Sequence, residues 1–134
     1  MKQEFPYLRQ GDQTYPLIDV ELIGPDRRLL VKALIDSGAS LSIFRPEIAH
    51  YLGISVETGQ RLYFQGIKSR IVGYLHQLPV KVNGEKFDCY VAFSAELETS
   101  FNLLGRDNFF HPFKITFNEK LQKVILERND DKKP

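Results

Sequence analysis

The residues best suited to chemistry lie at 34–40, where the sequence reads LIDSGAS. Two aliphatic residues lead directly to Asp36, and the small residues Ser37, Gly38 and Ala39 follow it. A carboxylate at the inner end of an apolar strand is costly to desolvate unless it is hydrogen-bonded. The position of Asp36 therefore indicates either a turn that the carboxylate caps or a reaction that uses the carboxylate.

Three roles are open for Asp36. As a turn cap it accepts backbone hydrogen bonds and needs nothing else from the chain. As a covalent nucleophile of the aspartyl-phosphate kind it needs a second acidic residue close behind it and a phosphate-binding loop, and the sequence has neither. As one of two paired carboxylates it activates water, because two such groups sharing one proton supply a general base and a general acid together.

Composition and charge limit the class of protein. The 134 residues suit one domain with a sizeable core, and a hydrophobic content of 43% indicates a folded chain. The net charge of +1, from 18 basic and 17 acidic residues, gives no support to a nucleic-acid-binding surface. The sequence has no signal-peptide pattern and no apolar run long enough to span a bilayer, so we expect a cytoplasmic protein without a membrane partner.

Cysteine and histidine usage argues against metal or cofactor chemistry. Cys89 is the single cysteine, cannot form an internal disulfide, and lies in the alternating stretch EKFDCYVAF, which predicts a buried small hydrophobe. His50, His76 and His111 are scattered, without a second ligand at metal-binding spacing. We therefore expect no metal and no cofactor.

The elements that must position Asp36 are mostly short strands separated by turns. Alternating apolar residues predict strands at 15–24, 28–36, 60–66, 69–77, 78–82, 85–93 and 114–127, the last of these being a hairpin. Asn83-Gly84 favours a type I′ turn between two of them. Pro46 and Gly53 bound one short helix within 44–54, and a helical turn precedes Pro112. Many short strands with little helix predict an all-β sandwich or barrel.

A second apolar segment, Leu103-Leu104-Gly105-Arg106-Asp107, follows the first by about 70 residues. Together the two segments resemble the retropepsin-like aspartic proteases, the family that includes the retroviral proteases. That family pairs an apolar-apolar-Asp-Ser/Thr-Gly-Ala/Ser strand end with an apolar-apolar-Gly-Arg-Asp/Asn segment near the C-terminus. The resemblance covers roughly residues 15–127.

The resemblance implies a fold class and a domain plan. The fold is expected to be all-β: a retropepsin-like closed β-barrel or sandwich with one or two short helices, which forms one half of an acid-protease site. Residues 1–14 are then an N-terminal segment, residues 15–127 the protease domain, and residues 128–134 a charged C-terminal tail.

The resemblance also implies roles for the residues around Asp36. Asp36 is the catalytic residue, and Ser37, Gly38 and Ala39 form the active-site loop. In the family, the hydroxyl after the aspartate bonds across to the other half-site. Gly38 lets backbone approach the carboxylates without a Cβ in the way, and Ala39 is small enough to line a cleft without filling it.

Two further groups of residues take their roles from the same resemblance. The tip of a hairpin that covers the substrate, the flap, is formed by Gln65, Gly66, Ile67 and Lys68. Structural support for the active-site loop comes from Leu103, Leu104, Gly105 and Arg106. The chain departs from the retroviral pattern at Ser40, where retroviral enzymes have an acidic partner for the arginine, so we expect Arg106 to pair with Asp107, Glu47 or a backbone carbonyl.

The number of aspartate motifs predicts the assembly. The sequence has one Asp-Ser-Gly and no internal duplication, so a site with two carboxylates requires two identical chains related by a two-fold axis. The predicted function is therefore an aspartic endopeptidase that hydrolyses peptide or protein substrates as a homodimer. One alternative is a catalytically silent module of the same fold that binds peptides or only dimerises. Another is an unrelated small β-barrel in which Asp36 caps a turn.

Overall fold

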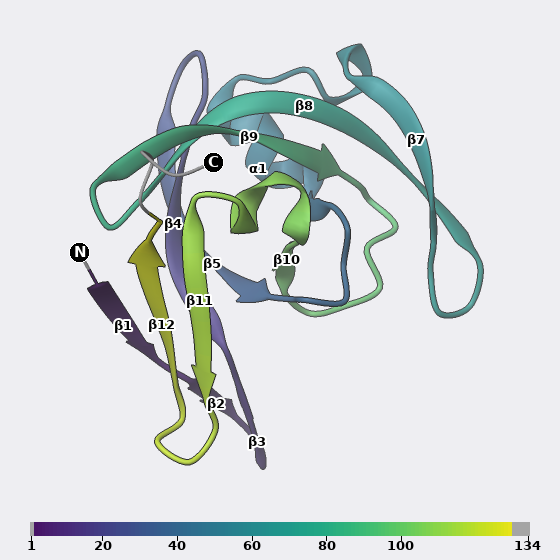
Figure 1. Ribbon diagram of the computed structural model, residues 1–134. Helices are drawn as coiled ribbons and strands as arrows, with labels where there is room; N and C mark the ends of the chain where they lie inside the picture. Colours follow the sequence, from purple (N-terminus) through teal and green to yellow (C-terminus); the bar gives the residue numbers. More distant parts are fainter. Residues whose placement is uncertain (1, 130–134) are drawn as a thin grey trace.

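The computed structural model describes residues 2–129, and most of them lie in strands (Figure 1). The strands are β1 (Lys2–Pro6), β2 (Leu8–Gln10), β3 (Gln13–Tyr15), β4 (Leu17–Ile23), β5 (Arg28–Ile35), β6 (Ser42–Phe44), β7 (Gln60–Gln65), β8 (Arg70–Val82), β9 (Glu85–Phe93), β10 (Asn102–Leu104), β11 (Phe113–Asn118) and β12 (Lys123–Arg128). The helical segments are α1 (Pro46–Leu52), the short turn η1 (Val56–Thr58) and the irregular turn η2 (Arg106–Phe110). The predicted all-β class with little helix is confirmed.

The main sheet has seven strands in the order β4-β5-β10-β6-β9-β8-β7 and closes into a ring where β4 also pairs with β8. The pairs β5–β10 and β6–β9 are parallel, and the other pairs in this sheet are antiparallel. Strand β7 pairs with the part of β8 that extends beyond the ring, so the β7–β8 hairpin projects from the body (Figure 1). This hairpin is the predicted flap.

The interior of the ring is filled by the apolar positions that the alternation marked. In β4, Ile18, Val20 and Leu22 are fully buried, whereas Asp19 between them is partly exposed and pairs with Lys32 at 2.8 Å. The largest fully buried side chains of the described residues are Phe44, Phe93, Phe109, Ile18, Leu22, Leu52, Leu104 and Leu126. Cys89 belongs to the same core, as the sequence predicted.

Two local predictions are confirmed: the bounds of the short helix and the turn at Asn83-Gly84. Helix α1 begins at Pro46 and ends at Gly53, which has the left-handed φ of 88° that terminates a helix. Asn83 and Gly84 have φ of 52° and 78°, and they join β8 to β9 with Val82 opposite Glu85.

The predicted break between the strands at 69–77 and 78–82 is wrong, because β8 runs unbroken from Arg70 to Val82 through Pro79. On the side of β8 away from β9, β7 pairs with residues 70–75 and β4 with residues 80–81. Pro79 lies in the gap between them, where no strand needs its missing N–H.

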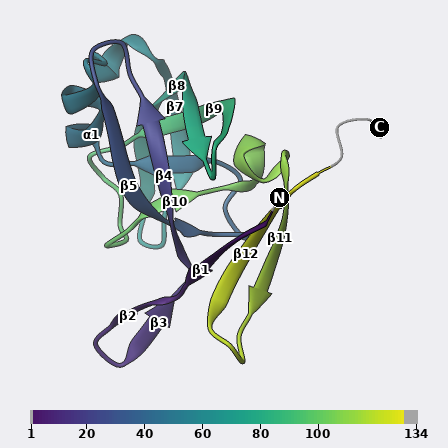
Figure 2. The ribbon, with the colours of Figure 1, turned by 90° about the vertical axis from the view of Figure 1, so that its left-hand side faces the viewer.

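The N-terminal segment contains three strands that the sequence did not reveal. Strand β1 pairs with β12, which also pairs with β11, and β2 and β3 form a separate hairpin. The signal was weak because Phe5 is the only buried residue of β1. Figure 2 shows the β2–β3 and β11–β12 hairpins extending from the body as two diverging arms. The boundaries proposed at residues 15 and 127 remain predictions, and most of the predicted tail lies outside the described residues.

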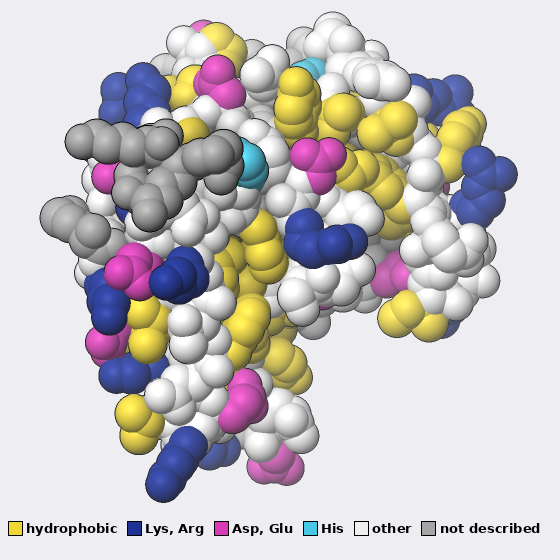
Figure 3. Space-filling view, viewed as in Figure 1, with side chains coloured by type: hydrophobic (Ala, Val, Ile, Leu, Met, Phe, Trp, Pro, Cys, Tyr) yellow, Lys and Arg dark blue, Asp and Glu magenta, His cyan; other side chains and the backbone are white. Residues whose placement is uncertain are grey.

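These arms expose apolar side chains. Leu8 on one hairpin and Phe117 and Leu121 on the other are exposed to solvent. In the space-filling view, hydrophobic side chains lie between charged ones in the lower left part of the molecule, where the arms extend (Figure 3). Within residues 2–129, no helix is long and apolar enough to cross a membrane.

Candidate active site

Asp36 follows β5 directly and is fixed by its neighbours on both sides. Its backbone N–H donates to the carbonyl of Leu104 at 3.0 Å, because β10 lies parallel to β5 with Leu104 opposite Ile35. Its Oδ1 accepts a hydrogen bond from the N–H of Gly38 at 2.9 Å, and its carbonyl accepts one from Ala39 at 3.1 Å. The carboxylate is half-buried and held in one orientation by the loop that follows it.

The two sequence segments meet through their main chains. The N–H of Arg106 donates to the carbonyl of Ala39 at 3.0 Å, and the N–H of Asp107 donates to that of Ser40 at 2.7 Å. A Cβ on Gly105 would lie 2.4 Å from the carbonyl oxygen of Leu41, so this close approach requires glycine. The segment after β10 therefore supports the loop after β5 with backbone hydrogen bonds.

The side chain of Arg106 does not take part in this support. Arg106 is exposed, and its guanidinium makes no hydrogen bond or ion pair with any residue from 2 to 129. Arg106 meets Ser40 and His111 around a separate polar hollow of about 420 Å³. The expected partners Asp107 and Glu47 do not bind it in this structure.

The flap tip lies beside the segment that joins β9 to β10. Gly66 closes the tip with a hydrogen bond from its N–H to the carbonyl of Ser69 at 2.8 Å. The N–H groups of Ile67 and Lys68 donate to the two carboxylate oxygens of Glu98, at 2.6 Å and 3.3 Å. Gln65 bonds the carbonyl of Gly66 through its side-chain amide, so each tip residue that the sequence singled out lies in one small network.

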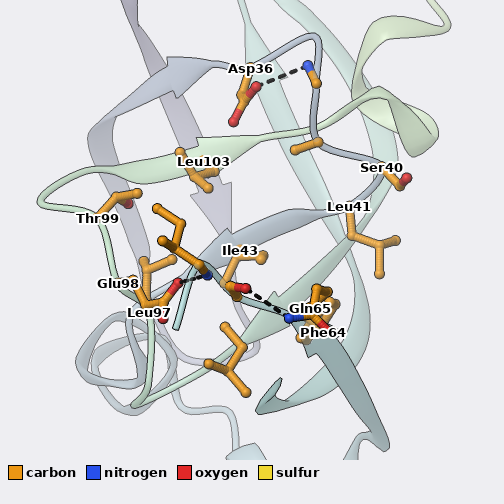
Figure 4. A pocket seen from close by; sticks show the side chains of 15 residues that line it. Asp36, Ser40, Leu41, Ile43, Phe64, Gln65, Leu97, Glu98, Thr99 and Leu103 are labelled. Atoms are coloured by element: carbon orange, nitrogen blue, oxygen red, sulfur yellow. Dashed lines mark hydrogen bonds between the residues drawn. The ribbon is translucent and has the colours of Figure 1, made fainter. Parts of the chain in front are cut away.

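A cleft of about 430 Å³ connects the loop of Asp36 with the flap (Figure 4). Its lining residues are Asp36, Gly38, Ala39, Ser40, Leu41, Ile43, Phe64, Gln65, Gly66, Ile67, Ile71, Leu97, Glu98, Thr99 and Leu103. Most of these side chains are apolar, and Asp36 and Glu98 are the charged ones. The two acids lie at opposite ends of the cleft, and Glu98 is occupied by the flap amides (Figure 4).

The cleft joins most of the residues that the sequence singled out and adds others. Asp36, the loop residues Gly38 and Ala39, and the tip residues from Gln65 to Ile67 line it together with Leu103. Ser37 and Lys68 do not line it, nor do Leu104 and Gly105, which support the loop from behind.

The wall formed by Leu97, Glu98 and Thr99 was not predicted from the sequence. This segment has neither strand alternation nor a turn motif, and it reaches the cleft because Arg45 holds it. The backbone N–H of Arg45 donates to the side chain of Asn102 at 3.1 Å, and its guanidinium donates to the carbonyl of Thr99.

Comparison with known proteins agrees with this architecture. The sequence model of the aspartyl protease family matches residues 20–107, which include both the loop of Asp36 and the segment at Gly105. A retropepsin-like aspartic protease from Rickettsia conorii has a similar structure, with a TM-score of 0.68 and 18% identity over 94% of this chain and 91% of that chain. An inhibitor complex of EIAV protease matches with a TM-score of 0.55 and 15% identity, over 74% of this chain and 88% of that one. No curated protein matches the sequence.

The family model covers more than half of the chain, and the solved structures match its overall fold over 94% and 74% of the chain. The resemblance read from the two sequence segments is confirmed at the level of family and fold. The chain belongs to the aspartyl protease family and has a retropepsin-like fold.

Proposed function

We propose that the protein is an aspartic endopeptidase that acts as a homodimer. The observation that carries this proposal is the setting of Asp36. Its carboxylate is oriented by Gly38 at one end of an apolar cleft, and the main chain around Gly105 and Arg106 fixes the loop that holds it. A group held in this way is preorganised for chemistry on a peptide lying in the cleft.

The need for two chains follows from the count of available carboxylates. One carboxyl group cannot act as general base and general acid in the same step. The other acid of the cleft, Glu98, is at the opposite end and is bound to flap amides. The second group of the pair therefore comes from Asp36 of the partner subunit, across a two-fold axis.

The paired carboxyl groups share one proton, because like charges a few ångströms apart do not both ionise easily. The ionised group takes a proton from water while the water oxygen attacks the peptide carbonyl carbon. The protonated group gives its proton to the carbonyl oxygen, which yields a neutral tetrahedral diol. The carboxyl group that took the proton from water then gives it to the nitrogen, while the other carboxylate takes a proton from a diol hydroxyl; the C–N bond breaks, an acid and an amine leave, and the pair returns to its starting state.

The neighbours of Asp36 fit the roles expected from the family. Ser37 is exposed, and its hydroxyl makes no hydrogen bond with residues 2–129, so it is available to bond across the dimer axis. A Cβ on Gly38 would come within 3.4 Å of Oδ1 of Asp36, so glycine leaves room beside the carboxylate. Ala39 lines the cleft with a small side chain.

The cleft favours an extended peptide with apolar residues beside the scissile bond. Its walls include Leu41, Ile43, Ile71 and Leu103. An apolar residue that binds against these side chains removes apolar surface from water, which lowers the free energy of binding. The flap then covers the peptide and supplies backbone donors.

The surface that joins two chains is proposed to include the three-stranded sheet and the projecting arms. Strands β1 and β11 are the free edges of that sheet, and Leu8, Phe117 and Leu121 are exposed on the arms. Unpaired edges and exposed apolar side chains are features that association would cover. A cytoplasmic location, and the lack of nucleic-acid and membrane partners, remain predictions from the sequence.

The test is cleavage of a mixed peptide library between pH 4 and 7 by the wild type and by Asp36→Asn, with the mass of each measured by light scattering. We expect cleavage by a wild-type dimer and none by the mutant dimer. A well-folded dimer that binds library peptides but cleaves none would favour the silent peptide-binding module. Cleavage that survives the substitution would refute the role of Asp36.

A further inference from the structure

The flap tip is attached to its own cleft wall by a carboxylate. Glu98 accepts two backbone N–H groups, from Ile67 at 2.6 Å and from Lys68 at 3.3 Å, one on each carboxylate oxygen. Hydrogen bonds to an ionised acceptor are roughly twice as strong as bonds between neutral groups. The tip is therefore held more firmly than a hairpin bend closed only by its own main chain.

The residues just before this wall also bind the flap, further from its tip. The N–H of Val72 on β8 donates to the carboxylate of Glu96 at 2.8 Å, and the carbonyl of Val72 accepts the hydroxyl of Ser94 at 2.6 Å. Ser94 and Glu96 lie just after the end of β9, and their side chains continue the contact with β8 where the backbone pairing of the two strands has ended. Glu98 is the last of these attachments and the one that reaches the tip.

The attachment holds the two tip amides at the Glu98 carboxylate, which lies in the same cleft as Asp36 but apart from it. Glu98 lies opposite Asp36 (Figure 4), and the amides of Ile67 and Lys68 lie against Glu98. Ile67 lines the cleft but is 90% exposed, so its side chain is not packed into the protein in this state. In the proposed function the flap supplies backbone donors to the peptide, and the two tip amides are here already bonded to the protein's own carboxylate.

We propose that Glu98 is a positioning residue that holds the flap tip on its own wall in the empty protein, and that a bound peptide takes over the amides of Ile67 and Lys68. Peptide carbonyls and the Glu98 carboxylate then compete for the same donors. This inference rests on the proposed function for its second half, because it takes the cleft to bind peptides. The first half concerns the unliganded chain alone.

The competition predicts the direction of each effect. Glu98→Gln keeps the size of the side chain but removes the charge, and the amide group of glutamine offers one oxygen instead of two. The tip is then released more easily, and the state that accepts a peptide is more populated. A peptide should bind the variant more tightly, although no contact with the peptide has been added.

The test compares Glu98→Gln with Glu57→Gln, each made with and without Asp36→Asn. Glu57 is an exposed glutamate on η1 that does not contact the flap tip, so it controls for the same chemical change. Hydrogen exchange of the backbone amides is measured by NMR in the unliganded Asp36→Asn proteins, where no turnover occurs. We expect protection of the Ile67 and Lys68 amides to fall by about tenfold with Glu98→Gln and to stay unchanged with Glu57→Gln.

The second measurement is binding of a capped, uncharged hexapeptide with a serine at each end and four apolar residues between them. We expect its affinity for Asp36→Asn to rise about threefold when Glu98→Gln is added, and KM of the active protein to fall by a similar factor while kcat changes less. Equal exchange of the tip amides with and without the Glu98 carboxylate would overturn the attachment. Weaker peptide binding by Glu98→Gln would overturn the competition and make Glu98 a support of the closed flap.

The two halves can fail separately. If the Glu98→Gln protein loses amide protection and binds the peptide more tightly, but no variant cleaves any peptide, the result supports the role of Glu98 and refutes the endopeptidase. If peptides are cleaved but the exchange of the tip amides does not depend on Glu98, the endopeptidase stands and this inference is refuted.

Discussion

The contact between Gly105 and Leu41 gives the sharpest test of how the active-site loop is held. A Cβ added to Gly105 would lie 2.4 Å from the carbonyl oxygen, 2.5 Å from the carbonyl carbon and 2.8 Å from the nitrogen of Leu41. All three are backbone atoms, so no side chain can rotate away. To restore ordinary contact near 3.4 Å, the two segments must separate by about 1 Å in Gly105→Ala.

The cost follows from the hydrogen bonds that cross this contact. The N–H groups of Gly105, Arg106 and Asp107 donate to Ser42, Ala39 and Ser40 at 3.0, 3.0 and 2.7 Å, respectively. Weakening three bonds of ordinary strength, together with local overpacking, corresponds to about 2–4 kcal/mol of unfolding free energy. For a domain of this size that lowers the melting temperature by roughly 10 °C. A displacement of about 1 Å in the loop should also reduce kcat by about 100-fold.

The assay is thermal unfolding followed by circular dichroism at one fixed protein concentration, because the proposed dimerisation would make the transition concentration-dependent. Gly38→Ala is the matched control for stability, since a Cβ there meets only Oδ1 of Asp36 at an ordinary 3.4 Å. If Gly105→Ala melted within about 2 °C of Gly38→Ala, the loop could move away from residue 105 without losing stability. The close approach of Gly105 to Leu41 would then not be what fixes the loop.

Three further outcomes test the carboxylate, the core and the buried thiol. Asp36→Asn should melt within about 2 °C of the wild type, because the asparagine oxygen still accepts the N–H of Gly38. Cleavage should fall by roughly 1,000-fold or more. Cleavage that is unchanged in this variant would instead favour the turn cap. Leu104 lies in the core, so Leu104→Ala should lower the free energy of unfolding, measured with urea, by about 2–5 kcal/mol. The control is Leu30→Ala at an exposed position, which should lower it by less than about 0.5 kcal/mol. Equal losses would contradict the burial of Leu104. Burial raises the pKa of the Cys89 thiol from 9.0 to about 12, so as the pH rises the unfolded chain loses this proton before the folded protein does. The free energy of unfolding of the wild type should therefore fall by about 1 kcal/mol between pH 9 and 10. A Cys89→Ala protein with the same pH dependence would refute the assignment of this effect to Cys89.

The sequence determined the features whose cause is local. The alternation of Ile18, Val20 and Leu22 predicts a strand with one buried face, and the structure buries these three side chains. Asn83-Gly84 specifies its turn, because few residue pairs adopt two successive positive φ angles. The motif of Asp36 with its small residues, together with the later glycine at 105, is enough to indicate the family.

The placement of β10 was decided by the tertiary structure. This strand of three residues lies between β5 and β6, and only this placement brings Leu104 to the backbone of Asp36 and Gly105 to Leu41. The two segments are about 70 residues apart, and no local pattern states which strands become neighbours.

Glu98 shows the same limit at the site itself. Its segment has no periodicity, and its importance comes only from lying against a hairpin tip about 30 residues earlier in the chain. Likewise, the N-terminal strand β1 has one buried side chain, and it is held as a strand by antiparallel pairing with the edge of β12. Residue types and local spacing determine turns, strand faces and which carboxylate is the candidate for catalysis, because those depend on a few consecutive residues. The partners of each strand edge and free amide depend on closure of the whole sheet, so they emerge only from the tertiary structure.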